Sequence, residues 1–235
     1  MSPKLENAGH PVLWRANGNG HHNGNGKAEF DHFDEVDSYA AHPVYATPES
    51  KTAIEQAVRE ILIHVGEDPD RDGLQRTPHR VAKMYSELLE GYTQDLKKVI
   101  NGAMFEAEYG QGEMIVVADI EYNSLCEHHM LPFVGKAHVA YIPGERIVGL
   151  SKIPRIVDMF AHRLQVQERL TNEIADALQT ALEAKGVMVV MEGNHMCGAL
   201  RGVKKHGVNM VTTARRGAFE HSPDLRDEFY RLIGK

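Results

Sequence analysis

The chain is poor in three features that would place it in other classes of protein. It has only two cysteines, its apolar runs are short, and its formal net charge is -7 over 235 residues. Two cysteines are too few for the disulfide framework of a small secreted protein. Its longest apolar runs, such as VMVVM at residues 187–191, fall far below the roughly 20 residues that cross a bilayer. These absences predict a soluble cytoplasmic protein without a signal peptide or membrane span.

The acidic balance also argues against nucleic acid as a partner. Proteins that bind nucleic acid by bulk electrostatics need a basic face to displace counterions. A bound polyanion must therefore meet a local basic cluster, and the sequence has two: Ser151, Lys152 and Arg155 at an expected helix start, and Arg201, Lys204 and Lys205. Helix starts and cationic side chains attract anions. The clusters favour a phosphorylated small substrate, with a solvated charged face as the alternative.

Composition and periodicity divide the chain into three regions. Residues 1–46, which contain NGNGHHNGNG, lack apolar periodicity and are predicted to be a disordered arm. Residues 47–112 read as an N-terminal helical region. A helical hairpin is expected there, because Thr47 with Pro48 and Thr77 with Pro78 are two helix start signals, and Gly91 is a stop signal.

Residues 113–235 read as a catalytic α+β domain. The expected strands are 113–122, 133–143, 146–150, 187–196 and 207–219, and the expected helices are 151–164, 167–186 and 222–233. Strand pairs on either side of a helical pair are typical of an antiparallel sheet covered by helices.

The two cysteines lie in segments that also carry histidines. Cys126 precedes His129 by three residues, a spacing with which one tight turn offers sulfur and imidazole to one metal ion. His195 and Cys197, two apart on an expected strand, would face the same side. Either His128 or His129 would ligate and the other transfer protons, leaving a fourth position open to water as in catalytic zinc sites. The alternatives are a buried pair of small apolar side chains or a disulfide.

Three long segments carry a family resemblance. NSLCEHHMLPFVGKAHVAYIP, VGLSKIPRIVDMFAHRLQVQERLT and HMCGALRGVKK, in this order and spacing, resemble GTP cyclohydrolase I over residues 47–235. The resemblance implies a zinc enzyme that converts GTP and water to 7,8-dihydroneopterin 3'-triphosphate and formate, the first step of pterin and folate biosynthesis. It also implies a tunnelling fold, in which antiparallel sheets and paired helices of several subunits close into a barrel. The expected assembly is a homodecamer with active sites between subunits and no identifiable regulatory partner.

The resemblance also implies roles for individual residues. Cys126, His129 and Cys197 would hold zinc, while His128 and His195 would move protons. Glu168 would read guanine by accepting hydrogen bonds from N1-H and the 2-amino group, assisted by Gln167. The residues implied for the ribose and triphosphate are Ser151, Lys152, Arg155 and Arg201, with Arg80 from a neighbouring subunit.

Two other functions are compatible with the same residues. One is a different pterin-binding or pterin-transforming enzyme of this fold, and the other is a non-enzymatic scaffold stabilised by a closed zinc site. The absence of the H-x-E and P-C-x-x-C signature argues against a zinc deaminase. Family members vary just after the second cysteine and in the last strand, where this chain has Gly198, Arg215 and Arg216, so the resemblance does not determine subunit contacts or regulation.

Overall fold

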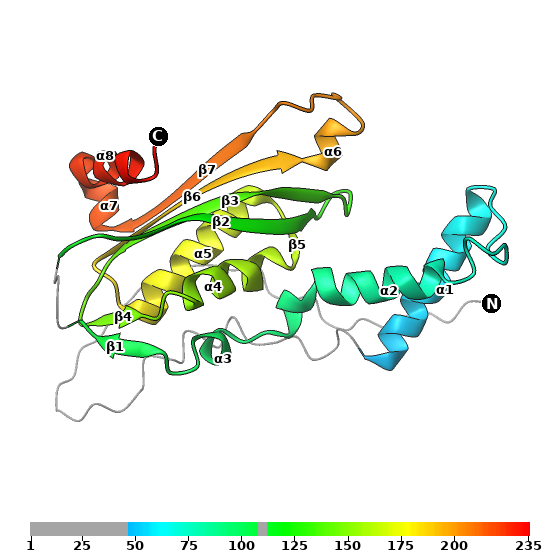
Figure 1. Ribbon diagram of the computed structural model, residues 1–235, viewed down its shortest axis with the longest axis horizontal. Helices are drawn as coiled ribbons and strands as arrows, with labels where there is room; N and C mark the ends of the chain where they lie inside the picture. Colours follow the sequence, from blue (N-terminus) through cyan, green and yellow to red (C-terminus); the bar gives the residue numbers. More distant parts are fainter. Residues whose placement is uncertain (1–46, 108–111) are drawn as a thin grey trace, which may run out of the picture. The chain divides into compact units, whose positions relative to one another are not determined.

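The computed structural model describes residues 47–107 and 112–235, so the predicted arm 1–46 lies outside the described residues. The helices are Pro48–His64 (α1), Thr77–Leu88 (α2), Leu96–Ile100 (α3), Lys152–Ala161 (α4), Gln167–Leu182 (α5), Met196–Ala199 (α6), Ala218–His221 (α7) and Pro223–Leu232 (α8), with a 3-10 turn at Glu90–Thr93 (η2) (Figure 1). The strands are Met104–Glu106 (β1), Ile115–Cys126 (β2), Pro132–Ile142 (β3), Arg146–Val148 (β4), Leu164–Gln165 (β5), Gly186–His195 (β6) and Met210–Gly217 (β7). Within the described ranges, no helix is long and apolar enough to cross a membrane.

The predicted helical hairpin is present as α1 and α2. The Thr47 hydroxyl caps α1 by accepting a hydrogen bond from the Ser50 backbone N–H at 3.2 Å, as the sequence predicts. Thr77 is not the cap of α2, because its own N–H already donates to Leu74 in the preceding turn, at 2.8 Å; Arg76 occupies the cap position. The hairpin prediction is confirmed, with the second start signal displaced by one residue.

The sequence predicted that Gly91 ends α2. This is wrong, because α2 already stops at Leu88. Gly91 lies in η2, where its N–H donates to the His162 carbonyl at 3.0 Å. A Cβ atom on Gly91 would lie 2.1 Å from the carbonyl oxygen of Met159. Glycine is needed here because it lets the backbone approach the end of α4 closely.

The main sheet has the strand order β5-β2-β3-β6-β7. All its neighbouring strands are antiparallel except the short β5, which runs parallel to β2. A second, small sheet joins β1 to β4, so the region 47–112 contributes a strand as well as helices.

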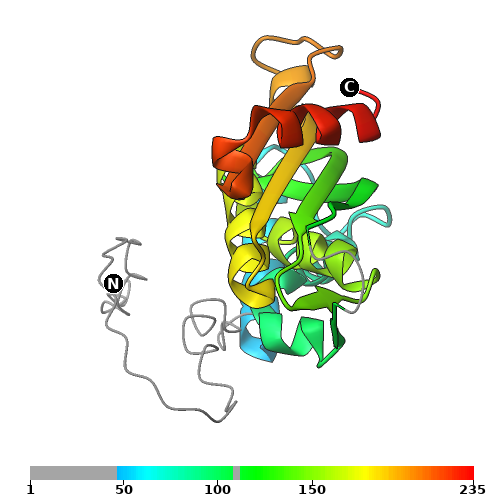
Figure 2. The ribbon, with the colours of Figure 1, turned by 90° about the vertical axis from the view of Figure 1, so that its left-hand side faces the viewer.

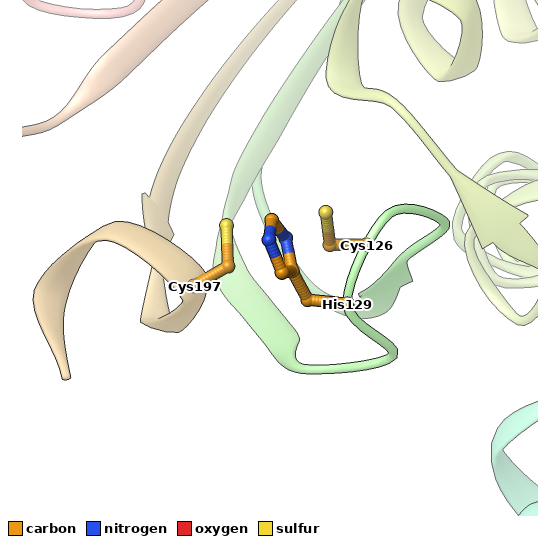
Figure 3. A group of neighbouring side chains, drawn as sticks. All are labelled: Cys126, His129 and Cys197. Atoms are coloured by element: carbon orange, nitrogen blue, oxygen red, sulfur yellow. The ribbon is translucent and has the colours of Figure 1, made fainter. Parts of the chain in front are cut away.

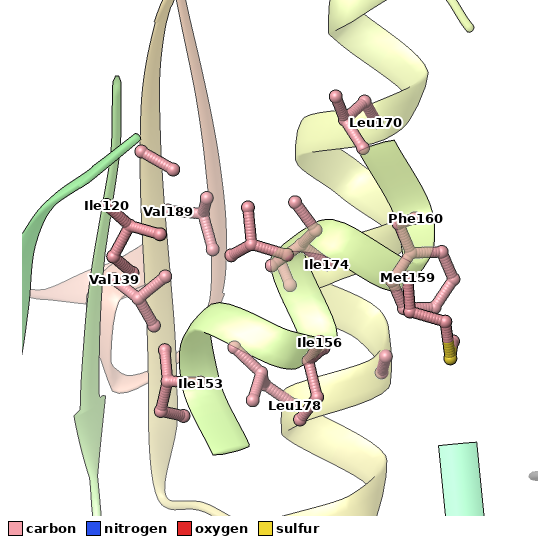
Figure 4. Packing of buried hydrophobic residues seen from close by; sticks show 14 of the residues in the cluster. Ile120, Val139, Ile153, Ile156, Met159, Phe160, Leu170, Ile174, Leu178 and Val189 are labelled. Carbon is pink, nitrogen blue, oxygen red and sulfur yellow. The ribbon is translucent and has the colours of Figure 1, made fainter. Parts of the chain in front are cut away.

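Alternate residues of the central strands face opposite sides of the sheet. The paired Val139 and Val189 belong to a core closed by α4 and α5 (Figure 4). The neighbouring pair Ala140 and Met188 belongs to a smaller core beneath α7 and α8, which lie on the opposite face of the sheet (Figure 2). Each large apolar side chain that is fully buried in these cores contributes about 1.5–3 kcal/mol. Two helical layers therefore hold the sheet from both sides.

Two strand boundaries differ from the sequence prediction in ways that affect the site. β2 continues through Cys126 instead of ending at residue 122, because Leu125 and Cys126 also pair with β5. β6 ends at His195, and Met196–Ala199 turn into α6, where the Leu200 N–H donates to the Met196 carbonyl at 3.0 Å. The argument that His195 and Cys197 share one strand face is therefore wrong: a helical turn orients Cys197.

Candidate active site

Three side chains from two distant segments meet beside the end of the sheet. One ligand atom from each of Cys126, His129 and Cys197 lies within 4.8 Å of the others, and the side chains point toward one another (Figure 3). Both cysteines are free thiols in this geometry; Cys126 is buried and Cys197 half-buried. Two sulfurs and one imidazole are a donor set that suits zinc, so the residues fit the ion that the sequence predicts.

The turn after β2 separates the two neighbouring histidines. The Met130 N–H donates to the Cys126 carbonyl at 2.7 Å, and Met130 itself has a positive φ of 53°. In this turn His129 joins both cysteines, whereas Nδ1 of His128 lies 3.8 Å from the sulfur of Cys126 alone. The sequence argument assumed an extended chain here, which is wrong, but the division between one histidine in the group and one beside it holds.

Arg169, which the sequence reasoning missed, braces this turn. Its guanidinium donates to the carboxylate of Glu127 and, at 3.0 Å each, to the Leu164 carbonyl and the Gln165 side-chain oxygen. The Glu127 N–H in turn donates to the Gln165 carbonyl at 3.0 Å. Arg169 stands inside the quoted segment QERLT, but nothing in its spacing marks it, since its partners come together only through β5.

Two thiols lie close together in this group, with the guanidinium of Arg201 as a nearby positive charge. Burial raises the pKa of the Cys197 thiol, and the neighbouring Cys126 thiol raises it further; Arg201 opposes both effects. A bound cation favours the thiolate form and so reverses the shift. Arg201 also lies with one guanidinium nitrogen 3.2 Å from Nε2 of His129, which brings one predicted phosphate ligand to the metal group.

His195 and Glu168 lie on the same side of the sheet end. The ring of His195 stacks on Phe133 with centroids 4.5 Å apart and planes 3° from parallel. Burial lowers the pKa of His195, and the nearby carboxylate of Glu168 raises it by a smaller amount, which favours a neutral ring at pH 7. Glu168 is exposed in the first turn of α5, where its carboxylate is free to accept hydrogen bonds from a ligand.

The other predicted phosphate ligands lie at the start of α4, the end of this helix that is far from the metal group. Lys152 and Arg155 line a cavity of about 410 Å³ that also includes residues of η2 and α3. Lys152 is 8% exposed, and its ammonium donates to the Val99 carbonyl at 3.0 Å. α4 runs for about 15 Å at 1.5 Å per residue before the chain reaches β5 beside Cys126 (Figure 1). Within one chain, the start of α4 and the metal group therefore lie toward opposite ends of this helix.

The two remaining predicted substrate-binding residues are exposed. Both are far in the sequence from the residues of the metal group. Ser151 occupies the N-cap position of α4 as predicted, although its hydroxyl makes no capping hydrogen bond. Arg80 lies on the exposed side of α2 in the helical hairpin.

An α+β domain with an open site of two cysteines and one histidine is typical of enzymes with a catalytic zinc ion. The family model for GTP cyclohydrolase I matches residues 54–234, and the chain belongs to this family. Membership confirms the predicted α+β tunnelling fold, to which the sheet with its helical pair conforms.

The relatives agree with this assignment along most of their length. A GTP cyclohydrolase 1 of Deinococcus radiodurans is 54% identical over 79% of this chain and 85% of its own. A second, from Pseudomonas putida, is 56% identical over 75% of this chain and 94% of its own. A third, from Pseudomonas aeruginosa, is 53% identical over 78% and 97%, respectively.

Proposed function

We propose that the protein converts GTP and water to formate and 7,8-dihydroneopterin 3'-triphosphate, with Zn²⁺ at Cys126, His129 and Cys197. Membership of the GTP cyclohydrolase I family supports the reaction. The observation that carries the proposal is the convergence of three donor atoms within 4.8 Å, because this donor set accounts for the hydrolytic part of the chemistry. These three residues would hold the zinc ion, which when bound would supply a Lewis acid for activating water.

The protein's own histidines would move the protons of the reaction. His128 stands beside the metal group and is 64% exposed, so a substrate has access to its ring. His195, stacked on Phe133, is held at a fixed angle beside Glu168. Positioned imidazoles at two points around the base and ribose can protonate a leaving nitrogen and accept a proton from water.

Glu168 is proposed to select guanine. Its carboxylate accepts two hydrogen bonds, and the N1-H and 2-amino group of guanine offer two donors side by side, which adenine does not. Its place at the start of α5, on the side of His195, supports this role.

The triphosphate is proposed to lie between two subunits. Arg201 stands at the metal group, whereas Ser151, Lys152 and Arg155 stand at the far end of α4. Both sets can act on one nucleotide if the metal end of one protomer faces the α4 cavity of its neighbour. The homodecamer and the contribution of Arg80 from a neighbouring subunit are part of the same proposal, and a cytoplasmic location accords with the two free cysteines.

The direct test is to incubate the purified full chain, loaded with zinc, with GTP. We expect stoichiometric formate and a pterin that becomes fluorescent after oxidation. ATP is the control substrate, and the Cys197→Ser protein is the control enzyme; neither should give formate. A fluorescent product without formate would indicate a different pterin enzyme, and a folded zinc protein that leaves GTP unchanged would indicate a scaffold.

A further inference from the structure

We infer that Gln167 is a positioning residue whose side-chain amide holds His195 with its hydrogen on Nε2, leaving Nδ1 as the nitrogen that exchanges protons with the substrate. The inference rests on the proposed proton-transfer role of His195. It adds a specific atom to that role and gives the buried Gln167 a function that acts through His195.

The orientation of the Gln167 amide follows from its neighbours. Gln167 is fully buried, and its Nε2 lies 3.1 Å from the Met191 carbonyl oxygen and 3.0 Å from that of Met210. Carbonyl oxygens only accept hydrogen bonds, so the amide nitrogen, which donates two, must face them. The amide oxygen must then face the other way, where it lies 3.0 Å from Nε2 of His195.

The orientation of the amide determines where the imidazole carries its hydrogen. An amide oxygen has no hydrogen to donate, so the hydrogen bond forms only if Nε2 of His195 is the donor. In the neutral ring Nδ1 then holds the lone pair, and it is the nitrogen that can take up a proton. Stacking on Phe133 fixes the plane of the same ring. The two contacts together set both the direction and the hydrogen position of the base.

Two threonines extend the hydrogen bonding and fix its direction. The Thr171 hydroxyl donates to the Gln167 backbone carbonyl at 2.6 Å and lies 2.6 Å from the Thr212 hydroxyl. Because the single hydrogen of Thr171 is already used, Thr212 donates to Thr171, and its oxygen, 3.1 Å from the Gln167 amide nitrogen, shares one of that nitrogen's two hydrogens with a neighbouring carbonyl. These hydrogen bonds connect the Gln167 amide to its own backbone carbonyl through the two threonines, so they resist rotation of the amide.

The space that the Gln167 amide occupies depends on the glycine at position 193. A Cβ atom on Gly193, two residues before His195, would lie 2.2 Å from the amide oxygen of Gln167 and 2.8 Å from the hydroxyl of Tyr122. Glycine therefore leaves the room that the Gln167 side chain needs to reach His195.

Kinetics on zinc-loaded enzyme test the inference. We expect Gln167→Met and Thr212→Val each to lower kcat for formate release by roughly 10- to 100-fold, part of what a positioned proton-transfer group contributes. Zinc content and KM for GTP should stay within about twofold of the parent values, since the Gln167 amide faces protein carbonyls and His195, so the predicted assistance of Gln167 to guanine binding would come from its backbone. If Gln167→Met fails to fold, Thr212→Val still tests the inference. The matched controls are Gln179→Met on the same helix and Thr213→Val on the same strand, and both should keep the parent kcat.

Nitrogen-15 NMR of histidine-labelled enzyme, with the His195 signals identified by their loss in His195→Asn, supplies the second readout. We expect the neutral ring to carry hydrogen on Nε2 in the parent and to become a mixture of tautomers in Gln167→Met. Hydrogen on Nδ1 in the parent, or a full kcat in both Gln167→Met and Thr212→Val, would overturn the inference. Absence of formate from the parent enzyme would instead overturn the proposed function.

Discussion

At the scale of single residues, the metal group depends on side chains that never touch a metal. Arg169 ties Glu127, in the turn that carries His129, to the Gln165 side chain in β5. Gln165 is 1% exposed and also donates to the Phe160 carbonyl at 3.1 Å, so the brace is anchored in the core. The position of His129 relative to the two sulfurs is therefore set by residues on α5 and β5 as well as by its own turn.

Replacing Arg169 tests this brace. We expect Arg169→Met to weaken zinc affinity by about 10- to 100-fold, because loss of the outer contacts loosens the ligating turn. Competition with a zinc chelator measures the affinity. Arg59→Met, which removes an ion pair with Asp70 on the helical hairpin, is the matched control and should leave zinc affinity unchanged. Equal affinity in both variants would show that the turn needs no brace.

The ligand assignment makes a second prediction at this scale. Cys126→Ala and Cys197→Ala should each bind almost no zinc after purification, since either change removes one of three donors. His128→Ala should keep its zinc and lose turnover, because its ring lies beside the three donors, 3.8 Å from the sulfur of Cys126, and is not one of them. Metal analysis of each variant gives the answer, and full zinc in either cysteine variant would refute the assignment.

At the scale of elements, α5 serves both the core and the site. Its first turn carries Gln167, Glu168 and Arg169, which face His195, the proposed guanine position and the metal turn, respectively. Its next turns bury Leu170, Ile174 and Leu178 against the sheet. The packing of the helix thus fixes the direction of its functional first turn.

Shortening a side chain on this buried face should lower stability strongly. Leu178 is fully buried, so Leu178→Ala should cost about 2–5 kcal/mol in the free energy of unfolding through lost burial and a cavity. Leu178→Met nearly preserves volume and should cost less than about 1.5 kcal/mol. Urea unfolding of the two variants compares them at one position. Equal losses would mean that α5 is not packed as tightly as its burial indicates.

At the scale of the whole molecule, the two basic sets lie far apart along α4. Arg201 lies at the metal group, while Arg155 lines the cavity at the other end of α4. This separation supports the proposal that the triphosphate lies between two protomers.

Mixing two inactive variants tests this arrangement. Cys197→Ser and Arg155→Ala should each have little activity alone. Co-expressed in equal amounts, they should recover activity, because roughly a quarter of the interfaces in a random assembly join two intact halves. The formate assay measures the recovery, and mixing after purification without subunit exchange is the control. Mixed assemblies that stay inactive would mean that one chain supplies the whole site.

The sequence predicted much of this fold because its signals were local. The caps and apolar stripes of the helices, and the apolar runs within β3 and β6, mark their elements directly. It did not predict β1, β5, α3, α6 or α7, which are short, and the strand expected at 207–219 gives way to α7 at Ala218. The same limit applies to the site: residue type and spacing indicated Cys126, Cys197 and one of two histidines, and the family resemblance singled out His129. Arg169 and Thr212 could not be found, since their partners are distant in sequence.

X-ray absorption at the zinc edge on the purified, GTP-free protein tests the central claim most directly. The account predicts one zinc per chain with two sulfur ligands at about 2.3 Å and two nitrogen or oxygen ligands at about 2.0–2.2 Å, one of which exchanges with solvent. Cys197→Ser protein saturated with zinc should show one sulfur ligand. A parent spectrum with fewer than two sulfurs, or with four ligands all from protein, would contradict it.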